Sequence, residues 1–517
     1  MEPSTEPQKP DRGALILTAG LAFVKLLLHL YTNAFAGYGI FRDELYYIAC
    51  SNRLGAGYVD QPPLSIYILK LNRLLFGDSL FALRLLPALA GALTVFLAGR
   101  IAQKIGGGKT AILIACLATI AAPILLGMNA FYSMNSFDIL LWALAAYLIV
   151  SLIDNGSEKL WLLLGVVLGL GLLNKIGFLW LGAGIFMWLI VTPHRRHLKT
   201  RWPYMAALIA LILFSPYIIW NLQNDFAHIE FVRNATSQKY SSVSPIDFIA
   251  GQFLIMSPLG VIIGITGLLY LLVSRNARKF NALSIIFITT FLILLLNRHS
   301  KPEYMGASYP MLFAGGAVLI EQLCRKKGWA WFKYVTAGLL IATGAFLAPF
   351  ALPILPVDAY IRYATKIGFG IENAEGKETG DLHQFFADMF GWENMARTVS
   401  DIYRSLPEAD REKCVLLAWN YGEAGAIEFY SSKYDLPPAI SPHNSFWIWG
   451  PGETDGSVLM IFGGTKEGYA ESFESIEEAG IIRCTYCMPY ENNLPVFICR
   501  NLKKPLDEVW ERIKNYN

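Results

Sequence analysis

The chain is poor in charged residues and in cysteine for its length. Of its 517 residues only 16% are charged and seven are cysteine, whereas 54% are apolar. Soluble domains carry about 25% charged residues, so the composition argues against a wholly soluble enzyme. It also excludes a disordered chain and a small fold held together by disulfides. A membrane protein is the class that fits.

The sequence also lacks a nucleotide-binding loop. Residues 106–110 (GGGKT) resemble the end of a phosphate-binding loop, but Gln103 stands where that loop requires glycine. Gly165, Gly169 and Gly171 imitate a dinucleotide loop, yet they lie in an apolar run, where small residues let helices pack closely. A nucleotide-sugar donor therefore has no visible site, and no nucleic-acid partner is expected.

Apolar runs recur through the first 352 positions, and about 20 such residues span a bilayer as a helix. The N-terminus shows no small-residue cleavage site ahead of a short apolar segment, so we predict a retained first span and not a cleaved signal peptide. We predict about eleven transmembrane helices, at residues 14–31, 81–99, 110–127, 136–153, 160–173, 177–192, 203–221, 249–273, 282–296, 305–323 and 330–352.

The formal net charge of +3 conceals two oppositely charged parts. Residues 1–352 hold 28 Lys and Arg against 15 Asp and Glu, a balance of +13, and residues 353–517 hold 15 against 25, a balance of −10. With the N-terminus inside, the basic clusters at 195–201, 275–279 and 325–327 all fall in cytoplasmic loops, as membrane insertion favours. The long loop 32–80 and the acidic C-terminal part are then predicted to lie outside the cytoplasm.

From about residue 356 the pattern changes to short strands and helices. We predict buried strands at 414–419 (CVLLAW) and 457–462 (SVLMIF), helices at 423–432 and 467–479, and a hairpin near 491–493. This alternation indicates a small α/β domain over residues 353–517, following a membrane domain over residues 1–352.

Four cysteines lie in this C-terminal domain, at Cys414, Cys484, Cys487 and Cys499. Cys484 and Cys487 form a CxxC pair, but no second CxxC or nearby His pair completes a zinc site. A disulfide that involves Cys499 in an oxidising compartment and reduced, packed cysteines both remain open.

Carboxylates are scarce in the membrane domain, and nine of the 15 fall on the outer side of the predicted topology. Asp43 and Glu44 open a segment with apolar Leu45, Ile48 and Ala49, which is typical of a short helix on the membrane surface. The amides of a helix N-terminus would favour the Asp43 anion. An ordinary helix cap with a solvated acid is the alternative.

Two further acids and two lysines are predicted on the same side. Asp60 precedes the pair Pro62–Pro63, which fixes a bend, and Asp138 opens the fourth span, where an unpaired charge is costly. Lys175 and Lys301 face them. Basic groups suit a phosphate, and a carboxylate can accept a proton from an attacking hydroxyl.

Six motifs in succession resemble bacterial family 39 glycosyltransferases, relatives of protein O-mannosyltransferases and of the transferase that adds aminoarabinose to lipid A. They are FRDELYYIA, GYVDQPPL, FGDSLFALRLLPALAG, SMNSFDILLWAL, LGLGLLNKIG and HSKPEYMGASYP. The resemblance runs in order from about residue 31 to 320. Two departures bear on the donor contacts: Gln61 replaces a basic residue found in some relatives, and Glu303 and Met305 flank Tyr304 where many bacterial members have paired tyrosines.

The resemblance implies a polytopic, all-α glycosyltransferase C-type fold with its site at the non-cytoplasmic face. The implied enzyme inverts the anomeric centre as it moves a sugar from a polyprenyl phosphate to a lipid, glycan or protein acceptor, in a bacterial inner membrane. Carried over onto this chain, the catalytic residues are Asp43, Glu44 and Asp138, and the residues that bind donor or acceptor are Asp60, Lys175, His228, Lys301 and Tyr304.

Three alternatives accompany this prediction. In the first, the transferase site also holds a divalent metal ion, bound by Asp43, Asp60 and His228. A transporter or flippase of lipid-linked sugars would use the same acids along its path, but the internal repeats typical of transporters are not seen. The C-terminal domain, finally, is either a module that binds the acceptor or a partner, or a lid over the site.

Overall fold

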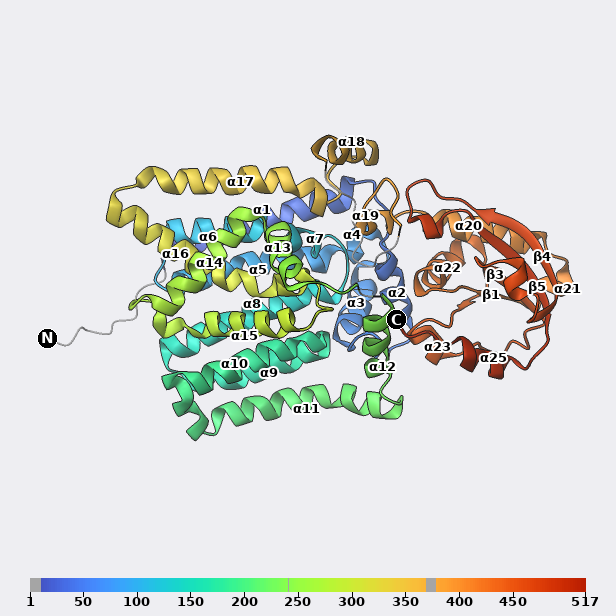
Figure 1. Cartoon of the computed structure of the whole chain (residues 1–517), viewed down its shortest axis with the longest axis horizontal. Helices are drawn as coiled ribbons and strands as arrows, with labels where there is room; N and C mark the ends of the chain where they lie inside the picture. Colours follow the sequence, from blue (N-terminus) through green and yellow to red (C-terminus); the bar gives the residue numbers. More distant parts are fainter. Residues whose placement is uncertain (1–10, 240, 369–377) are drawn as a thin grey trace.

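Each apolar run predicted as a span forms helix in the structure, a computed structural model that describes residues 11–239, 241–368 and 378–517. The long helices lie side by side in one bundle (Figure 1). The helices up to residue 368 are α1 (Arg12–Phe35), α2 (Arg42–Asn52), α3 (Leu64–Phe76), α4 (Leu80–Leu83), α5 (Leu85–Lys104), α6 (Lys109–Ala121), α7 (Pro123–Gly127), α8 (Met134–Asn155), α9 (Leu160–Asn174), α10 (Leu179–Val191), α11 (Trp202–Gln223), α12 (Ala227–Asn234), α13 (Pro245–Met256), α14 (Pro258–Val273), α15 (Ala282–Leu296), α16 (Tyr309–Lys327), α17 (Ala330–Ala351) and α18 (Val357–Ile367). Short 3₁₀ and π turns join them, namely η1 (Ile176–Phe178), η2 (Pro193–Lys199), η3 (Ala235–Lys239), η4 (Arg278–Phe280) and η5 (Pro302–Ser308).

Five of these helical segments are long and apolar enough to cross a membrane: α1, the α4–α5 segment, α8, α11 and α17. The number rises to seven if each of two bent helix pairs counts as one span. Three further apolar helices, α6, α9 and α15, are shorter. The count of about eleven spans therefore stays a prediction.

The predicted span 249–273 is not one helix. Helices α13 and α14 meet at Ser257 with a bend of 108°, where Ser257 has φ +66°. Pro258 lacks an N–H group and disfavours helical backbone at the residue before it, so α13 ends there. The Ser257 hydroxyl oxygen then accepts from the Gly260 amide, at 3.2 Å, and caps α14. Pro123 likewise divides the predicted span 110–127 into α6 and α7.

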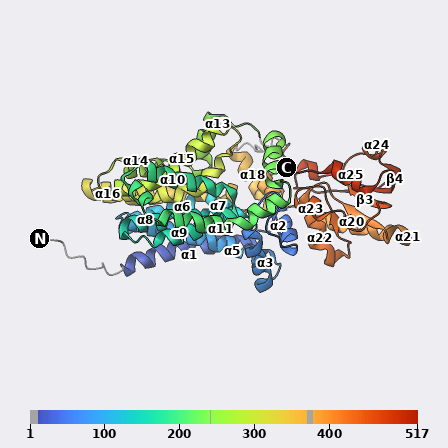
Figure 2. The same ribbon diagram turned by 90° about the horizontal axis from the view of Figure 1, so that it is seen from below.

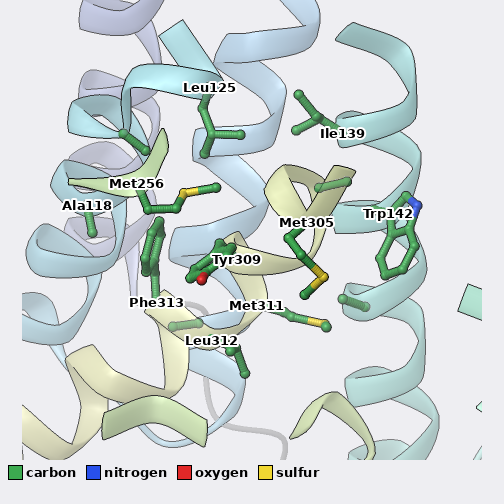
Figure 3. Close-up of a cluster of buried hydrophobic side chains, with 14 of the residues drawn as sticks. Ala118, Leu125, Ile139, Trp142, Met256, Met305, Tyr309, Met311, Leu312 and Phe313 are labelled. Atoms are coloured by element: carbon green, nitrogen blue, oxygen red, sulfur yellow. The ribbon is translucent and has the colours of Figure 1, made fainter. Parts of the chain in front are cut away.

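A hydrophobic core supports the end of the bundle where η5 lies (Figure 3). Met305 of η5 is fully buried, and Tyr309 and Phe313 follow it into the core on α16. Their neighbours in the core come from other helices and include Ala118, Leu125, Ile139, Trp142 and Met256. The polar residues that precede Met305 are thus carried on a segment that the core holds in place.

The C-terminal domain, residues 378–517, is a five-stranded mixed sheet in the order β2-β1-β3-β5-β4. The parallel strands are β1, β2 and β3, and β5 runs antiparallel to both β3 and β4. The strands are β1 (Cys414–Leu417), β2 (Ala439–Ile440), β3 (Val458–Phe462), β4 (Phe473–Ile482) and β5 (Leu494–Leu502). The helices and turns are α19 (Gln384–Ala387), α20 (Trp392–Ser405), α21 (Glu408–Arg411), α22 (Tyr421–Tyr434), α23 (Ser445–Trp449), α24 (Lys466–Tyr469), η6 (Pro489–Glu491) and α25 (Leu506–Ile513).

The predicted strands, the helix at 423–432 and the hairpin are confirmed as β1, β3, α22 and the β4–β5 pair. The predicted helix at 467–479 is wrong, because only α24 is helical there and β4 begins at Phe473. Phe473 and Ile476 pack into the core, while Glu474, Glu477 and Glu478 are exposed along an edge strand. Charged side chains are typical of edge strands, and here they imitate the spacing of an amphipathic helix.

The two faces of the sheet pack differently. Leu459 and Phe497 lie on the face covered by Trp510 of α25. Met460 and Ile498 lie on the other face, in a core that includes α20 and α22 and continues into Leu45 of α2. Figure 2 shows α2 between the bundle and this domain. The C-terminal domain and the helical bundle thus share a core at α2.

All seven cysteines are free thiols. Cys499 is buried on the α25 face of the sheet, so the disulfide considered for it is not formed, and the packed, reduced alternative holds. Cys484 and Cys487 lie in the β4–β5 connection, where the Cys487 amide donates to Cys484 Sγ at 3.2 Å. A hydrogen bond from the Cys487 thiol lowers the pKa of Cys484 from 9.0 to about 7.

We expect iodoacetamide to label Cys484 before any other cysteine, because its thiolate is populated above about pH 7 and because it is partly exposed whereas the other six are buried. Peptide mass spectrometry should show a labelling rate that rises through pH 7. In Cys487→Ala the rise should move toward pH 9, since the thiol donor is gone. First labelling at Cys487, or an unchanged midpoint in that variant, would contradict the assignment.

Candidate functional site

A cavity of about 710 Å³ lies between the end of the helical bundle and the C-terminal domain. Its walls come from α2, the loops after α2 and α9, α12, η5 and the segment 383–389. Six of the eight site residues expected from the sequence line it, namely Asp43, Asp60, Lys175, His228, Lys301 and Tyr304. Residues far apart in the chain are therefore brought to one space, with acids, bases and aromatic rings on its walls.

Asp43 lies in the first turn of α2, at the N-terminal end of the helix. Its Oδ1 accepts a hydrogen bond from the hydroxyl of Tyr421, at 2.9 Å, and lies 3.8 Å from Nε of Arg42. The Asp43 side chain is 37% exposed, so solvent or substrate can reach it. A carboxylate that is held but accessible is suited to accept a proton.

Glu44 is buried beside Asp43 and points away from the cavity. Arg84 donates to both of its oxygens, at 2.9 and 2.7 Å, and both side chains are only 1% exposed. The backbone amides of Phe41 and Tyr132 donate to the same carboxylate, at 2.8 and 2.7 Å. The support that Glu44 gives to Asp43 is thus indirect, because it fixes the start of α2 against the α4–α5 segment.

Asp60 accepts a hydrogen bond from a tyrosine of α2. The Tyr46 hydroxyl donates to Asp60 Oδ1 at 2.8 Å and lies 2.8 Å from Oγ of Ser445 in the C-terminal domain. Burial, and then the neighbouring Asp60 carboxylate, raise the pKa of Tyr46 well above its usual value. The phenol therefore stays protonated and keeps its hydrogen bond.

The basic side of the cavity is organised around Lys175, which follows the last residue of α9. Its Nζ donates to Asn135 Oδ1 at 2.7 Å, lies 3.8 Å from Asp138 Oδ2 and sits over the Tyr304 ring at 5.4 Å. Asp138 is buried and does not line the cavity, so its contact with substrate would run through Lys175. Lys301 approaches Glu303 Oε1 at 4.0 Å on the neighbouring wall.

His228 does not complete a metal site with Asp43 and Asp60. Its Nδ1 is hydrogen-bonded to the Val59 carbonyl oxygen at 3.0 Å. Burial lowers the pKa of the ring, so it is neutral near pH 7. Across the described ranges, no three His, Cys, Asp or Glu side chains are grouped so that they could hold a metal ion. The expected set of Asp43, Asp60 and His228 shares the cavity but is not arranged as a metal centre.

Four residues that meet at the cavity were missed by the sequence reasoning: Arg42, Asp388, Tyr421 and Asn444. Arg42 directly precedes Asp43 within a motif that was noticed, so its position was a usable signal. The other three lie in the C-terminal domain, outside every motif. They are far from Asp43 in the sequence, so no local pattern linked them to the site.

Comparison with known proteins finds a match to one family over part of the chain. Residues 60–220 match the family described as dolichyl-phosphate-mannose-protein mannosyltransferase. The chain is 29% identical over 187 residues to undecaprenyl phosphate-alpha-4-amino-4-deoxy-L-arabinose arabinosyl transferase 1 of Sodalis glossinidius, which covers 34% of this chain and 33% of that protein. It is 23% identical over 258 residues to the lipid A galacturonosyltransferase RgtD of Rhizobium johnstonii, covering 48% and 52%. The chain thus matches a third to about half the length of these relatives.

The fold is similar to that of ArnT from Cupriavidus metallidurans. The apo structure covers 94% of this chain and 98% of its own, with a TM-score of 0.62 and 13% identity. The structure bound to undecaprenyl phosphate gives a TM-score of 0.59 and 14% identity over the same shares. The predicted resemblance to family 39 glycosyltransferases is confirmed, as is the multi-spanning fold, and the chain is an integral membrane protein.

We expect Arg84→Met to destabilise the protein, because it leaves the Glu44 carboxylate buried without its partner. Breaking a buried ion pair costs about 3–5 kcal/mol. The measurement is the Tm of the purified protein in detergent. Lys433→Met is the matched control, since it removes the exposed pair with Glu393, which contributes about 1 kcal/mol or less. Equal effects of the two variants would refute the role given to Arg84.

Proposed function

We propose that the chain is an inverting glycosyltransferase that moves a sugar from a polyprenyl phosphate to a lipid, glycan or protein acceptor. The observation that carries this proposal is one cavity lined by an accessible carboxylate, Asp43, and by two lysines, Lys175 and Lys301. The fold and the sequence family support it, because relatives with partial matches are named as transferases of this kind.

The lysines are suited to the donor phosphate. In the reaction the bond between the anomeric carbon and the phosphate oxygen breaks, and negative charge grows on that phosphate. Lys175 and Lys301 neutralise this charge, and Asn135 and Asp138 keep Lys175 in place. Because the donor is already activated and membrane-bound, no nucleotide site is required.

In this proposal the acceptor binds in the part of the cavity next to Asp43. If the acceptor is a hydroxyl, Asp43 takes its proton as the oxygen attacks the anomeric carbon. A phosphate acceptor needs no base, and Asp43 then orients the sugar. Apolar residues of the cavity, among them Trp180, Leu254 and Ile255, are suited to the first units of the prenyl chain.

We further propose that the protein lies in a bacterial inner membrane, with the domain boundary near residue 352 and the C-terminal domain outside the cytoplasm. The turns α10–α11, α14–α15 and α16–α17 carry the basic clusters, and Figure 1 shows them at the end of the bundle far from the C-terminal domain. Basic loops favour the cytoplasmic side, which puts the cavity on the opposite face. Acids gathered at one face suit a transferase better than a transport path through the midplane.

We expect Asp43→Asn to lower transfer by about 100-fold or more, because general base catalysis contributes on that scale. The assay uses the purified full chain in vesicles with a polyprenyl phosphate sugar, and follows the glycosylated acceptor. Asp247→Asn removes an exposed acid outside the cavity and should leave transfer unchanged. Near-normal turnover in Asp43→Asn would overturn the catalytic assignment.

We expect Lys175→Met to weaken binding of polyprenyl phosphate by about 10- to 100-fold, the scale of a hydrogen bond to a charged group. Asp138→Asn should have a smaller effect in the same direction, because it only loosens Lys175. Binding of the bare lipid phosphate can be measured by calorimetry in detergent. Lys466→Met, in α24 of the C-terminal domain, is the control. Wild-type affinity in Lys175→Met would exclude this lysine from the phosphate site.

A further inference from the structure

Helix α22 of the C-terminal domain packs directly on α2, the helix that carries Asp43. Two glycines allow this approach. A Cβ atom at Gly422 would clash with Cγ of Arg42, and one at Gly425 would lie 3.0 Å from the Leu45 carbonyl carbon. At the far end of the pair, Arg53 donates to both oxygens of Glu428, at 2.9 and 2.7 Å. The two helices are therefore joined along their length.

This contact places Tyr421, the first residue of α22, over the start of α2. Its ring packs against the rings of Tyr46 and His443, with centroids 4.8 Å away in each case. Asn420 and Glu423 cap the helix at this point. The ring is thus fixed by its neighbours, and its hydroxyl reaches Asp43 Oδ1 at 2.9 Å.

Arg42 is held away from the rest of the Asp43 carboxylate by the same domain. Its Nη1 donates to the Tyr490 hydroxyl at 2.7 Å, and its Nη2 lies 3.5 Å from Asp388 Oδ2. Its guanidinium also covers the Tyr421 ring at 5.5 Å. Its Nε lies 3.8 Å from Asp43 Oδ1.

The two oxygens of Asp43 are therefore not equivalent. The hydrogen bond from Tyr421 and the approach of Arg42 both fall on Oδ1. Within the parts of the chain that the structure describes, Oδ2 makes no hydrogen bond, and the residue lines the cavity. The carboxylate is oriented with one oxygen anchored and the other available.

We infer that Tyr421 is a positioning residue for the transfer reaction: its hydroxyl anchors Asp43 Oδ1 so that Oδ2 faces the acceptor. This inference rests on the proposed function, in which Asp43 takes the acceptor's proton. The C-terminal domain is then part of the catalytic apparatus and not only a cover or a module that binds the acceptor.

The test is Tyr421→Phe in the full-length protein, because it removes the hydroxyl and keeps the packed ring. We expect kcat to fall by about 10-fold with the donor KM unchanged, because the hydroxyl orients the Asp43 carboxylate and is not one of the groups proposed to hold the donor phosphate. Tyr403→Phe, which removes a hydroxyl bound to the Arg411 carbonyl in the same domain, should leave kcat and KM unchanged. A raised donor KM alongside the lower kcat would mean a merely structural role and would overturn the inference.

Two further variants separate this inference from the proposed function. Asp43→Asn combined with Tyr421→Phe should be no slower than Asp43→Asn alone, because the hydroxyl acts only through the carboxylate. If Asp43→Asn is inactive while Tyr421→Phe behaves as wild type, the positioning role is wrong and the proposed function stands. If Asp43→Asn is active, the proposed role of Asp43 fails first. Gly425→Leu, which separates α22 from α2, should reproduce the fall in kcat in protein that elutes as a single folded species.

Discussion

The buried ion pair of Glu44 and Arg84 is the contact on which the site geometry depends. It joins the start of α2 to the α4–α5 segment, and the Tyr132 amide ties the loop before α8 to the same carboxylate. Both charges are withdrawn from solvent, so neither can move without leaving the other unpaired at high cost. Asp43, the residue before Glu44 in α2, is thereby fixed in position while its own side chain stays accessible.

A second constraint comes from the other side of the cavity. The C-terminal domain shares a core with α2 and contacts the acids of the site in two ways. Its Tyr421 donates to Asp43, and its Ser445 contacts the Tyr46 hydroxyl of α2, which donates to Asp60. The bundle sets where α2 begins, and the C-terminal domain sets how its side chains are oriented. A site built between two layers in this way is complete only when both are folded and packed together.

The sequence errors share a cause. Periodic spacing predicted a helix at 467–479, but pairing with β5 made Phe473–Ile482 an edge strand whose acidic side chains face away from the core. Hydropathy predicted one span at 249–273, because the hydropathy of the residues gives no sign of the 108° bend at Ser257. In each case a local pattern was correct about which residues are apolar and wrong about the backbone that carries them.

Composition and hydropathy alone determined that this is a polytopic membrane protein with an acidic α/β domain after it, since burial of apolar residues in lipid is a local property of the chain. The motifs identified Asp43, Asp60, Lys175 and Lys301, because charged residues next to the spans are so few that each one can be considered individually. Only the tertiary structure decided that Glu44 is buried against Arg84, that Asp138 lies beside Lys175, and that Tyr421 meets Asp43 across 378 positions. Such contacts depend on how helices pack, and side-chain packing across long separations leaves no periodic trace in a single sequence.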